Sequence, residues 1–155
     1  MIKKLIKIWN KIKYKFKLGN TKKSKQLAKK IIKENNINHA YEISYFIQSK
    51  MKYVSDPLFG IIDTQQDLYY TKQIGWKGDC DDYALIAYRL AEQLGYKPFL
   101  LTLIRKDIRK NHVVCIFEKD NKIILIGTEG YQKFNNMNEL LKKKNAVYYS
   151  KDKIK

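Results

Sequence analysis

Residues 80–95 read CDDYALIAYRLAEQLG and predict the central helix of the fold. Apolar residues cover far more than one face of this stretch, which is typical of a helix that is buried on most of its sides. Gly78 and Asp79 precede the helix, and Gly95 closes it at the position just after its last turn. Cys80 is therefore predicted to be a thiol in the first turn of a buried helix.

The segments on either side of this helix differ in their apolar periodicity. Those before it repeat with a helical period, and those after it read as short strands with one hairpin turn. Helices followed by antiparallel strands predict an α+β fold, in which N-terminal helices and a small antiparallel sheet pack against helix 80–95. The expected elements are helices at 22–34 (capped by Thr21), 39–53 and 64–71 (capped by Asp63 or Thr64), a loop at 55–63, strands at 98–104, 112–117 and 122–126 with a turn at 119–121, a helix at 137–144 and a strand at 146–150.

The net charge of +17 is concentrated at the N-terminus. Residues 1–33 hold 13 of the 32 Lys and Arg residues and no acidic residue, which leaves 19 basic and 15 acidic residues from position 34 onward. We therefore divide the 155 residues into a basic N-terminal helical arm, 1–34, and a less charged body, 35–155, within one domain overall.

The basic arm has two interpretations. Segment 2–17 has the pattern of an amphipathic helix, which either docks on the protein's own body or contacts an anionic membrane surface or another acidic partner. Nucleic acid ranks lower as a partner because the sequence contains no recognised nucleic-acid motif.

Cysteine content and hydropathy bear on the compartment. Two cysteines are too few for a disulfide framework, and no apolar run is long enough for a transmembrane helix. The first residues lack the pattern of a signal peptide because lysines interrupt every apolar run. We expect a cytoplasmic or virion-associated protein.

Cys80 is a candidate nucleophile. A thiol attacks as its thiolate, which is stabilised by the positive end of a helix dipole and by a nearby imidazolium. His112, at the start of a strand expected beside the helix, could supply that imidazolium. The competing interpretation is a small buried apolar residue, which is the usual role of a helical cysteine. Asp79, Asp81 and Asp82 would raise the thiol pKa unless they face away or are paired.

The remaining cysteine and histidine fit structural roles. Cys115 lies three positions after His112 and is expected on the opposite strand face, which argues against a metal site shared with Cys80. His39 is expected to cap or flank the start of a helix. A zinc site is also disfavoured because the sequence lacks a second pair of closely spaced ligands.

The quoted residues are part of a longer match. GDCDDYALIAYRLAEQLGYKPFLLTL, residues 78–103, followed by NHVVCIF, 111–117, resembles the transglutaminase-like cysteine peptidase superfamily, which has a papain-like core. The resemblance covers roughly residues 43–130 and implies that the body, 35–155, is a transglutaminase-like domain. It implies that Cys80 is the nucleophile and His112 the general base and acid of an acyl transfer from an amide, completed by water or by an amine.

The resemblance also implies an oxyanion donor upstream of the nucleophile, in addition to the Cys80 backbone N–H. The candidates are Trp76, Tyr69, Gln65 and Gln66. Trp76 has a second interpretation, as a hydrophobic lid over the thiol.

At the third catalytic position the sequence departs from the family pattern. The simplest register places Gly127 where the family has an aspartate at the end of the next strand. Glu129 is a candidate substitute that reaches back to His112, and Thr128 is a weaker one. Without such a residue, the alternative function is a catalytically degenerate module that binds a partner, tethered to an acidic surface by its arm.

The implied chemistry requires no cofactor, and the implied substrate is a protein or peptide. A calcium ion bound by Asp79 and Asp81 remains an alternative that the resemblance implies, because some relatives bind this ion through acids that flank the nucleophile. Two carboxylates alone are too few to establish such a site.

Overall fold

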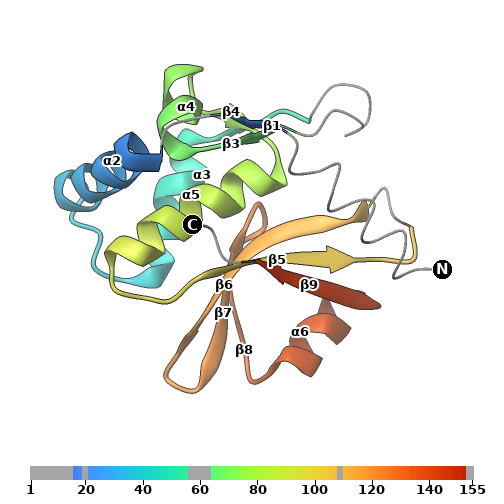
Figure 1. The fold of residues 1–155 in the computed structure, drawn as a ribbon. Helices are drawn as coiled ribbons and strands as arrows, with labels where there is room; N and C mark the ends of the chain where they lie inside the picture. Colours follow the sequence, from blue (N-terminus) through green and yellow to red (C-terminus); the bar gives the residue numbers. More distant parts are fainter. Residues whose placement is uncertain (1–15, 19–20, 56–63, 108–109, 153–155) are drawn as a thin grey trace.

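The computed structural model describes residues 16–18, 21–55, 64–107 and 110–152. Its helices and strands form layers around one central helix, α5 (Cys80–Gln93). Figure 1 shows α2, α3 and α4 on one side of α5 and a twisted sheet on its other side. The remaining helix, α6, covers the face of the sheet that is turned away from α5. The bounds are α2 (Thr21–Glu34), α3 (Ala40–Lys50), α4 (Leu68–Gln73) and α6 (Met137–Lys143).

The main sheet is antiparallel and has the strand order β8-β7-β6-β5-β9. Its central hairpin turns at Asp120 and Asn121, which both have positive φ angles, as a tight two-residue turn requires. The register places His112 opposite Leu103 and Gly127 opposite Gly130. The strands are β5 (Phe99–Ile104), β6 (His112–Lys119), β7 (Lys122–Gly127), β8 (Gly130–Phe134) and β9 (Tyr148–Asp152).

Four short strands form two parallel pairs near the start of α5. β1 pairs with β3, and β2 pairs with β4, which leads directly into α5. The bounds are β1 (Phe16–Leu18), β2 (Lys52–Tyr53), β3 (Thr64–Gln66) and β4 (Lys77–Gly78).

The alternation of side chains along the strands separates two hydrophobic clusters. Val113, Cys115 and Phe117 of β6 face α5 and join the larger cluster, which includes most of that helix. Val114 and Ile116 face the other way, into a smaller cluster under α6. The strand period of two therefore explains why a run of consecutive apolar residues can be buried on both faces of one sheet.

A buried ion pair joins α5 to α4. Arg89 is 1% exposed, and its Nε lies 3.4 Å from Oδ1 of Asp67, the N-cap residue of α4. Its Nη1 lies 3.6 Å from Glu92 Oε2. A buried guanidinium needs such partners because its charge is removed from water.

The predicted α+β fold class, with helix 80–95 against an antiparallel sheet, is confirmed, and the predicted strands of the main sheet are each found within two residues. α2 begins at Thr21 and packs through Ser24, Ala28 and Ile31. This helix lies within the range assigned to the basic arm, and it forms part of the core.

Other predictions were wrong in detail. The helix expected at 64–71 is strand β3 followed by α4, and its cap is Asp67 rather than Asp63 or Thr64. The helix expected at 39–53 ends at Lys50, and β8 was not predicted. The helix expected over 2–17 is wrong at Phe16 and Lys17, which belong to β1, and the rest of that segment lies outside the described residues, as does most of the loop at 55–63.

No helix within the described part of the chain combines the length and the apolar character needed to cross a membrane.

Candidate active site

Cys80 is the first residue of α5, and its side chain is half-buried. Asp79 is the N-cap residue, and its carboxylate accepts a hydrogen bond from the Asp81 amide at 3.2 Å. The amides of the first helical turn have no acceptor within the helix, so the positive end of the helix dipole lies at the thiol. The dipole therefore favours a negative charge at Cys80.

The Asp82 carboxylate holds the start of this helix in place. Its Oδ2 accepts from the Asp79 amide at 3.0 Å, and its Oδ1 accepts from the Gln66 amide of β3 at 2.8 Å. A Cβ atom on Gly78 would lie 2.5 Å from Asp82 Oδ2. The Gly-Asp-Cys-Asp-Asp motif thus has a physical basis, since residue 78 must lack a side chain for Asp82 to fold over it.

The three acidic residues beside Cys80 would oppose a thiolate if their charges faced the sulfur. Asp79 and Asp82 accept hydrogen bonds from backbone amides of the cap, and Asp81 is 1% exposed. Carboxylates that accept N–H bonds at a helix start are stabilised there. Their presence beside Cys80 is therefore explained in part by capping.

His112 is the first residue of β6 and has contacts on both sides of its ring. Its Nε2 lies 2.8 Å from Glu129 Oε2, and its side chain is also hydrogen-bonded to the side chain of Cys80. Since Nε2 is engaged by Glu129, Nδ1 is the ring nitrogen left for the thiol. Burial lowers the pKa of His112, but the hydrogen bonds to Cys80 and Glu129 and the negative charge of Glu129 outweigh burial and raise it to about 9.

Glu129 lies in the turn between β7 and β8 and bridges two cationic groups. Its Oε2 accepts from His112, and its Oε1 accepts from Lys144 Nζ at 2.6 Å. Burial raises the pKa of Glu129, but the bonds from His112 and Lys144 outweigh burial and lower it to about 2. The carboxylate is therefore ionised at neutral pH and faces the imidazole.

Gly127, the last residue of β7, lies directly beneath this carboxylate. A Cβ atom at Gly127 would be 2.7 Å from Glu129 Oε2 and 2.9 Å from Val114 Cγ1. The structure thus brings Glu129 to His112 across the space that a side chain at position 127 would fill. Thr128 does not take this place, because the ring nitrogen Nε2 bonds Glu129.

The candidate oxyanion donors are separated by the fold. Gln66 is tied through its amide to Asp82, and its Oε1 is buried without a hydrogen-bond partner among the described residues. Tyr69 is turned toward α2, where its amide bonds Ser24 Oγ and Lys23 Nζ lies over its ring. The side chain of Gln65 lies outside the described residues.

Trp76 precedes the nucleophile by four residues and has a left-handed backbone with φ of 59°. Its indole packs edge-on against Phe46 at 5.8 Å and is half-buried against the larger cluster. This packing fixes the ring between α3 and the start of α5.

Three carboxylates near Cys80 could hold a hard cation. Oxygen atoms of Asp79, Asp81 and Asp82 lie within 4.8 Å of one another. Carboxylate oxygens are the type of ligand that calcium prefers. Two of these carboxylates, however, already accept hydrogen bonds from backbone amides at the start of α5. Sequence reasoning named Asp79 and Asp81 for this role and omitted Asp82.

Sequence reasoning also missed Lys144. It is the C-cap residue of α6, follows Glu129 by 15 positions and is 11% exposed. In a chain with 32 basic residues, its position in the sequence carried no signal that distinguished it.

The other two candidates are structural. Cys115 is fully buried in the cluster that faces α5, and burial raises the pKa of its thiol. His39 is the N-cap residue of α3, and its ring stacks on Tyr41 at 5.5 Å.

Comparisons with known proteins identify the fold. No protein-family model matches the sequence, and no curated protein matches it. Among solved structures, a protein from Cytophaga hutchinsonii that is assigned as a cysteine protease matches with a TM-score of 0.54 and 16% identity, over 84% of this chain and 49% of that one. LapG from Legionella pneumophila, in an EGTA-treated form, matches with a TM-score of 0.51 and 16% identity, over 79% of this chain and 77% of that one.

This chain thus spans about half the length of the Cytophaga protein. At 16% identity the likeness establishes the fold. It agrees with the fold that the resemblance in the sequence implied. The chain has the papain-like fold of these two structures.

Proposed function

We propose that this protein is a cysteine hydrolase that cleaves amide bonds in a protein or peptide substrate, with Cys80 as nucleophile, His112 as general acid and base, and Glu129 as the residue that orients His112. The observation that carries the proposal is that one imidazole ring contacts both the candidate nucleophile and a carboxylate. The His112 ring is hydrogen-bonded to the Cys80 side chain and, through Nε2, to Glu129 Oε2 at 2.8 Å.

The electrostatics of the site favour a thiolate–imidazolium pair. With its pKa raised to about 9, His112 is an imidazolium at neutral pH while it faces the thiol and Glu129. A positive charge beside Cys80 and the N-terminal end of α5 both stabilise a thiolate. Glu129 balances the imidazolium and fixes its orientation, as the third group of a catalytic triad does.

The reaction then takes two steps. The Cys80 thiolate attacks the substrate carbonyl carbon, a C–S bond forms, and His112 gives its proton to the amide nitrogen as the C–N bond breaks. Water then adds to the thioester, His112 takes the water proton, and the C–S bond breaks to release a carboxylic acid and restore the thiolate.

The oxyanion formed in each step needs donors near Cys80. The Cys80 amide, as the first of α5, points out of the helix and supplies one. Gln66 is the preferred second donor, because its backbone amide is hydrogen-bonded to Asp82 in the first turn of α5, the turn that begins with Cys80. Trp76 is proposed as the lid over the thiol, and its packing against Phe46 supports a shielding role.

A calcium ion, when bound by Asp79, Asp81 and Asp82, would neutralise the carboxylates beside the nucleophile and rigidify the first turn of α5. The hydrolytic steps themselves use only the side chains named above. The basic residues 1–33 remain a proposed contact with an acidic surface, on the basis of their uncompensated charge.

The alternative of a degenerate binding module rests on the missing aspartate at position 127. Glu129 makes the contact with His112 that this aspartate would make, and the two cationic neighbours keep it ionised. The active enzyme is therefore the better-supported function.

The test compares the wild type with Cys80→Ala and Cys80→Ser on a proteome-derived peptide library, with cleavage sites identified by mass spectrometry. Wild-type protein is expected to generate new termini, and both variants are expected to lose them while retaining the wild-type melting temperature. Iodoacetamide should modify Cys80 in the folded protein far faster than the buried Cys115. Equal cleavage by wild type and Cys80→Ala would overturn the proposal.

A further inference from the structure

A cavity of about 990 Å³ adjoins the candidate active site on the His112 side. Its walls come from the β5–β6 connection, from the turn that carries Glu129 and from residues 141–147, which form the end of α6 and the loop before β9. His112 is part of this wall, whereas Cys80 is not. The cavity is therefore placed beside the proton donor rather than beside the nucleophile.

The cavity has an excess of positive charge that the rest of the domain lacks. Its acidic side chains are Asp107 and Glu129, and Glu129 is already paired with His112 and Lys144. From position 34 onward the whole chain has only four more basic than acidic residues, and the lining alone has the same excess. Among the described lining residues, six are basic: Arg105, Lys106, Lys110, Lys142, Lys143 and Lys144.

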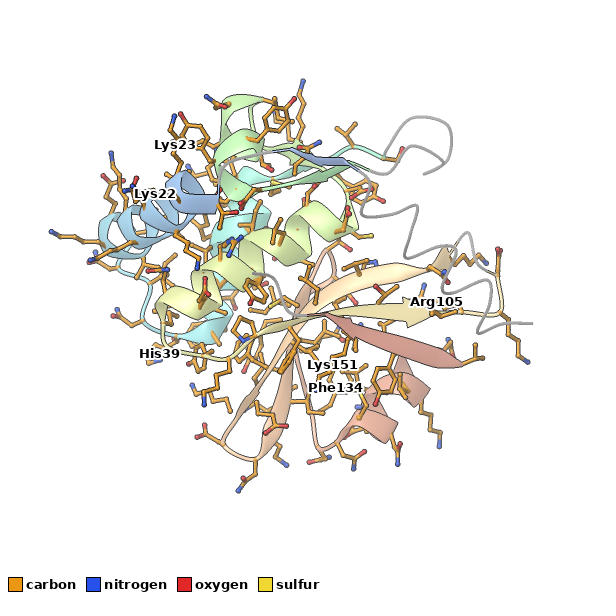
Figure 2. All side chains as sticks on the ribbon, viewed as in Figure 1. Lys22, Lys23, His39, Arg105, Phe134 and Lys151 are labelled. Atoms are coloured by element: carbon orange, nitrogen blue, oxygen red, sulfur yellow. The ribbon has the colours of Figure 1, made fainter. Side chains whose placement is uncertain are left out.

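Several of these cations are free to meet a ligand. Lys106, Lys110 and Lys142 are exposed and form no ion pair within the described part of the chain. Arg105 lies at the end of β5, on the sheet and far from Lys22 of α2 (Figure 2). Its Nε donates to the Lys144 backbone oxygen at 3.1 Å, which ties its guanidinium to the cavity wall.

We propose that this cavity is a substrate subsite that takes acidic peptide segments on the leaving-group side of the scissile bond. The inference rests on the proposed function, because it uses the roles of Cys80 and His112. The acyl carbon must lie at the Cys80 sulfur, while the leaving nitrogen must lie at His112, which protonates it. A cavity that His112 lines and Cys80 does not line therefore receives residues that follow the cleaved bond.

A peptide fits the lining better than a nucleic acid does. Single strands bind through bases that stack on aromatic rings, and none of the described lining residues is Phe, Tyr or Trp. Leu141, Ala146 and Val147 add apolar surface between the cations, which suits the side chains of a peptide.

Binding is tested with full-length Cys80→Ala protein and two fluorescent peptides of equal length, one rich in Asp and Glu and one with Asn and Gln in their place. The acidic peptide is expected to bind about tenfold more tightly at low ionic strength and to lose this advantage in salt. Lys110→Glu and Lys142→Glu should each weaken its binding about 3- to 10-fold. The matched reversals Lys97→Glu and Lys133→Glu, on exposed positions outside both the lining and residues 1–33, should leave it unchanged.

Equal weakening by the Lys97 and Lys133 reversals, or equal binding of both peptides, would overturn the acidic subsite. So would an oligonucleotide that binds with the same dependence on Lys110 and Lys142 and displaces the acidic peptide.

Cleavage data separate this inference from the proposed function. In the peptide library, the wild type should prefer Asp and Glu after the cleaved bond, and Lys110→Glu should remove that preference. Cleavage without any such preference would overturn the subsite and leave the hydrolase in place. Acidic-peptide binding that depends on Lys110 and Lys142, without any cleavage, would contradict the proposed reaction and support the binding site.

Discussion

A Cβ atom at Gly127 would lie 2.7 Å from Glu129 Oε2, so the glycine and the glutamate share one space beneath His112. The backbone of Gly127 is not in the left-handed region, and the need for glycine is therefore steric. The carboxylate at His112 comes from two residues further along the chain than the resemblance implied.

Gly127→Ala should reduce activity, because the added methyl group displaces the Glu129 carboxylate from His112. The double variant Gly127→Asp with Glu129→Ala should be more active than Gly127→Asp alone, since removal of Glu129 frees the space for an aspartate. Steady-state kcat/KM of the single and double variants measures this coupling. Additive losses would contradict the shared-space interpretation.

Glu129→Gln should lower the pKa of His112 from about 9 toward its ordinary value, because the variant removes the negative charge at Nε2. A smaller fraction of His112 would then carry the positive charge that stabilises a thiolate at neutral pH. As a result, kcat should fall on the order of 10²- to 10⁴-fold. NMR titration of the His112 ring protons measures the pKa. Glu118 is exposed and lies on β6, the strand that begins with His112. The matched control Glu118→Gln should leave the titration unchanged.

The His112–Glu129 pair should stabilise the fold most between about pH 4.5 and 6.5. The pKa of His112 is raised from 6.5 to about 9, so its contribution is complete below 6.5 and is lost as the pH rises through 9. The pKa of Glu129 is lowered from 4.5 to about 2, so its contribution is complete above 4.5 and is lost as the pH falls through 2. The difference in melting temperature between wild type and Glu129→Gln should be largest in that window and shrink on both sides. A difference that is independent of pH would show that the pair does not couple to folding.

Lys144→Met should raise the pKa of Glu129, because the ammonium group that holds Oε1 at 2.6 Å is lost. Glu129 would then orient His112 less firmly, and kcat should fall while KM for a neutral peptide changes little. Lys144→Arg should restore part of the activity, since it keeps the charge. Lys143, the neighbouring lysine that pairs with Glu139, provides the control Lys143→Met.

Asp67→Ala should destabilise the protein by about 3–5 kcal/mol, because it leaves the buried Arg89 without its main partner and removes the cap of α4. Chemical denaturation measures this loss. Replacing both residues, with Arg89→Met and Asp67→Ala together, should cost less than Asp67→Ala alone, since no buried charge is then left unpaired. A larger loss in the double variant would contradict this account.

The sequence was sufficient to predict the centre of the fold. Apolar residues lie on most sides of helix 80–95, so the helix had to be buried on most of its surface. The turn at 119–121 predicted the hairpin of β6 and β7. It was not sufficient for β8, because in GYQKF only Gly130 and Phe134 are buried and the strand lacks a regular apolar alternation. Strands of two or three residues, such as β2 and β4, are held by their neighbours and have no periodicity to read.

The candidate site was predictable as far as its pattern was local. Cys80 was indicated by its helix start, and His112 by the start of a strand beside that helix. The choice between Gly127, Thr128 and Glu129 depended on a turn whose conformation no periodicity describes, and the structure brings Glu129 to the ring. Lys144 depended on how α6 packs against the sheet, which a short helix of seven residues does not reveal in advance.

Lys144 follows Cys80, His112 and Glu129 in the chain, and this order has a consequence during synthesis. A ribosome makes the thiol and its helix first, then the imidazole, then the carboxylate, and only later the lysine that holds the carboxylate. A nascent protein therefore contains the nucleophile before it contains the group that completes its electrostatic support, and a domain generally folds as a unit. The proposed hydrolase is therefore expected to acquire full reactivity only after α6 and β9 have closed onto the sheet.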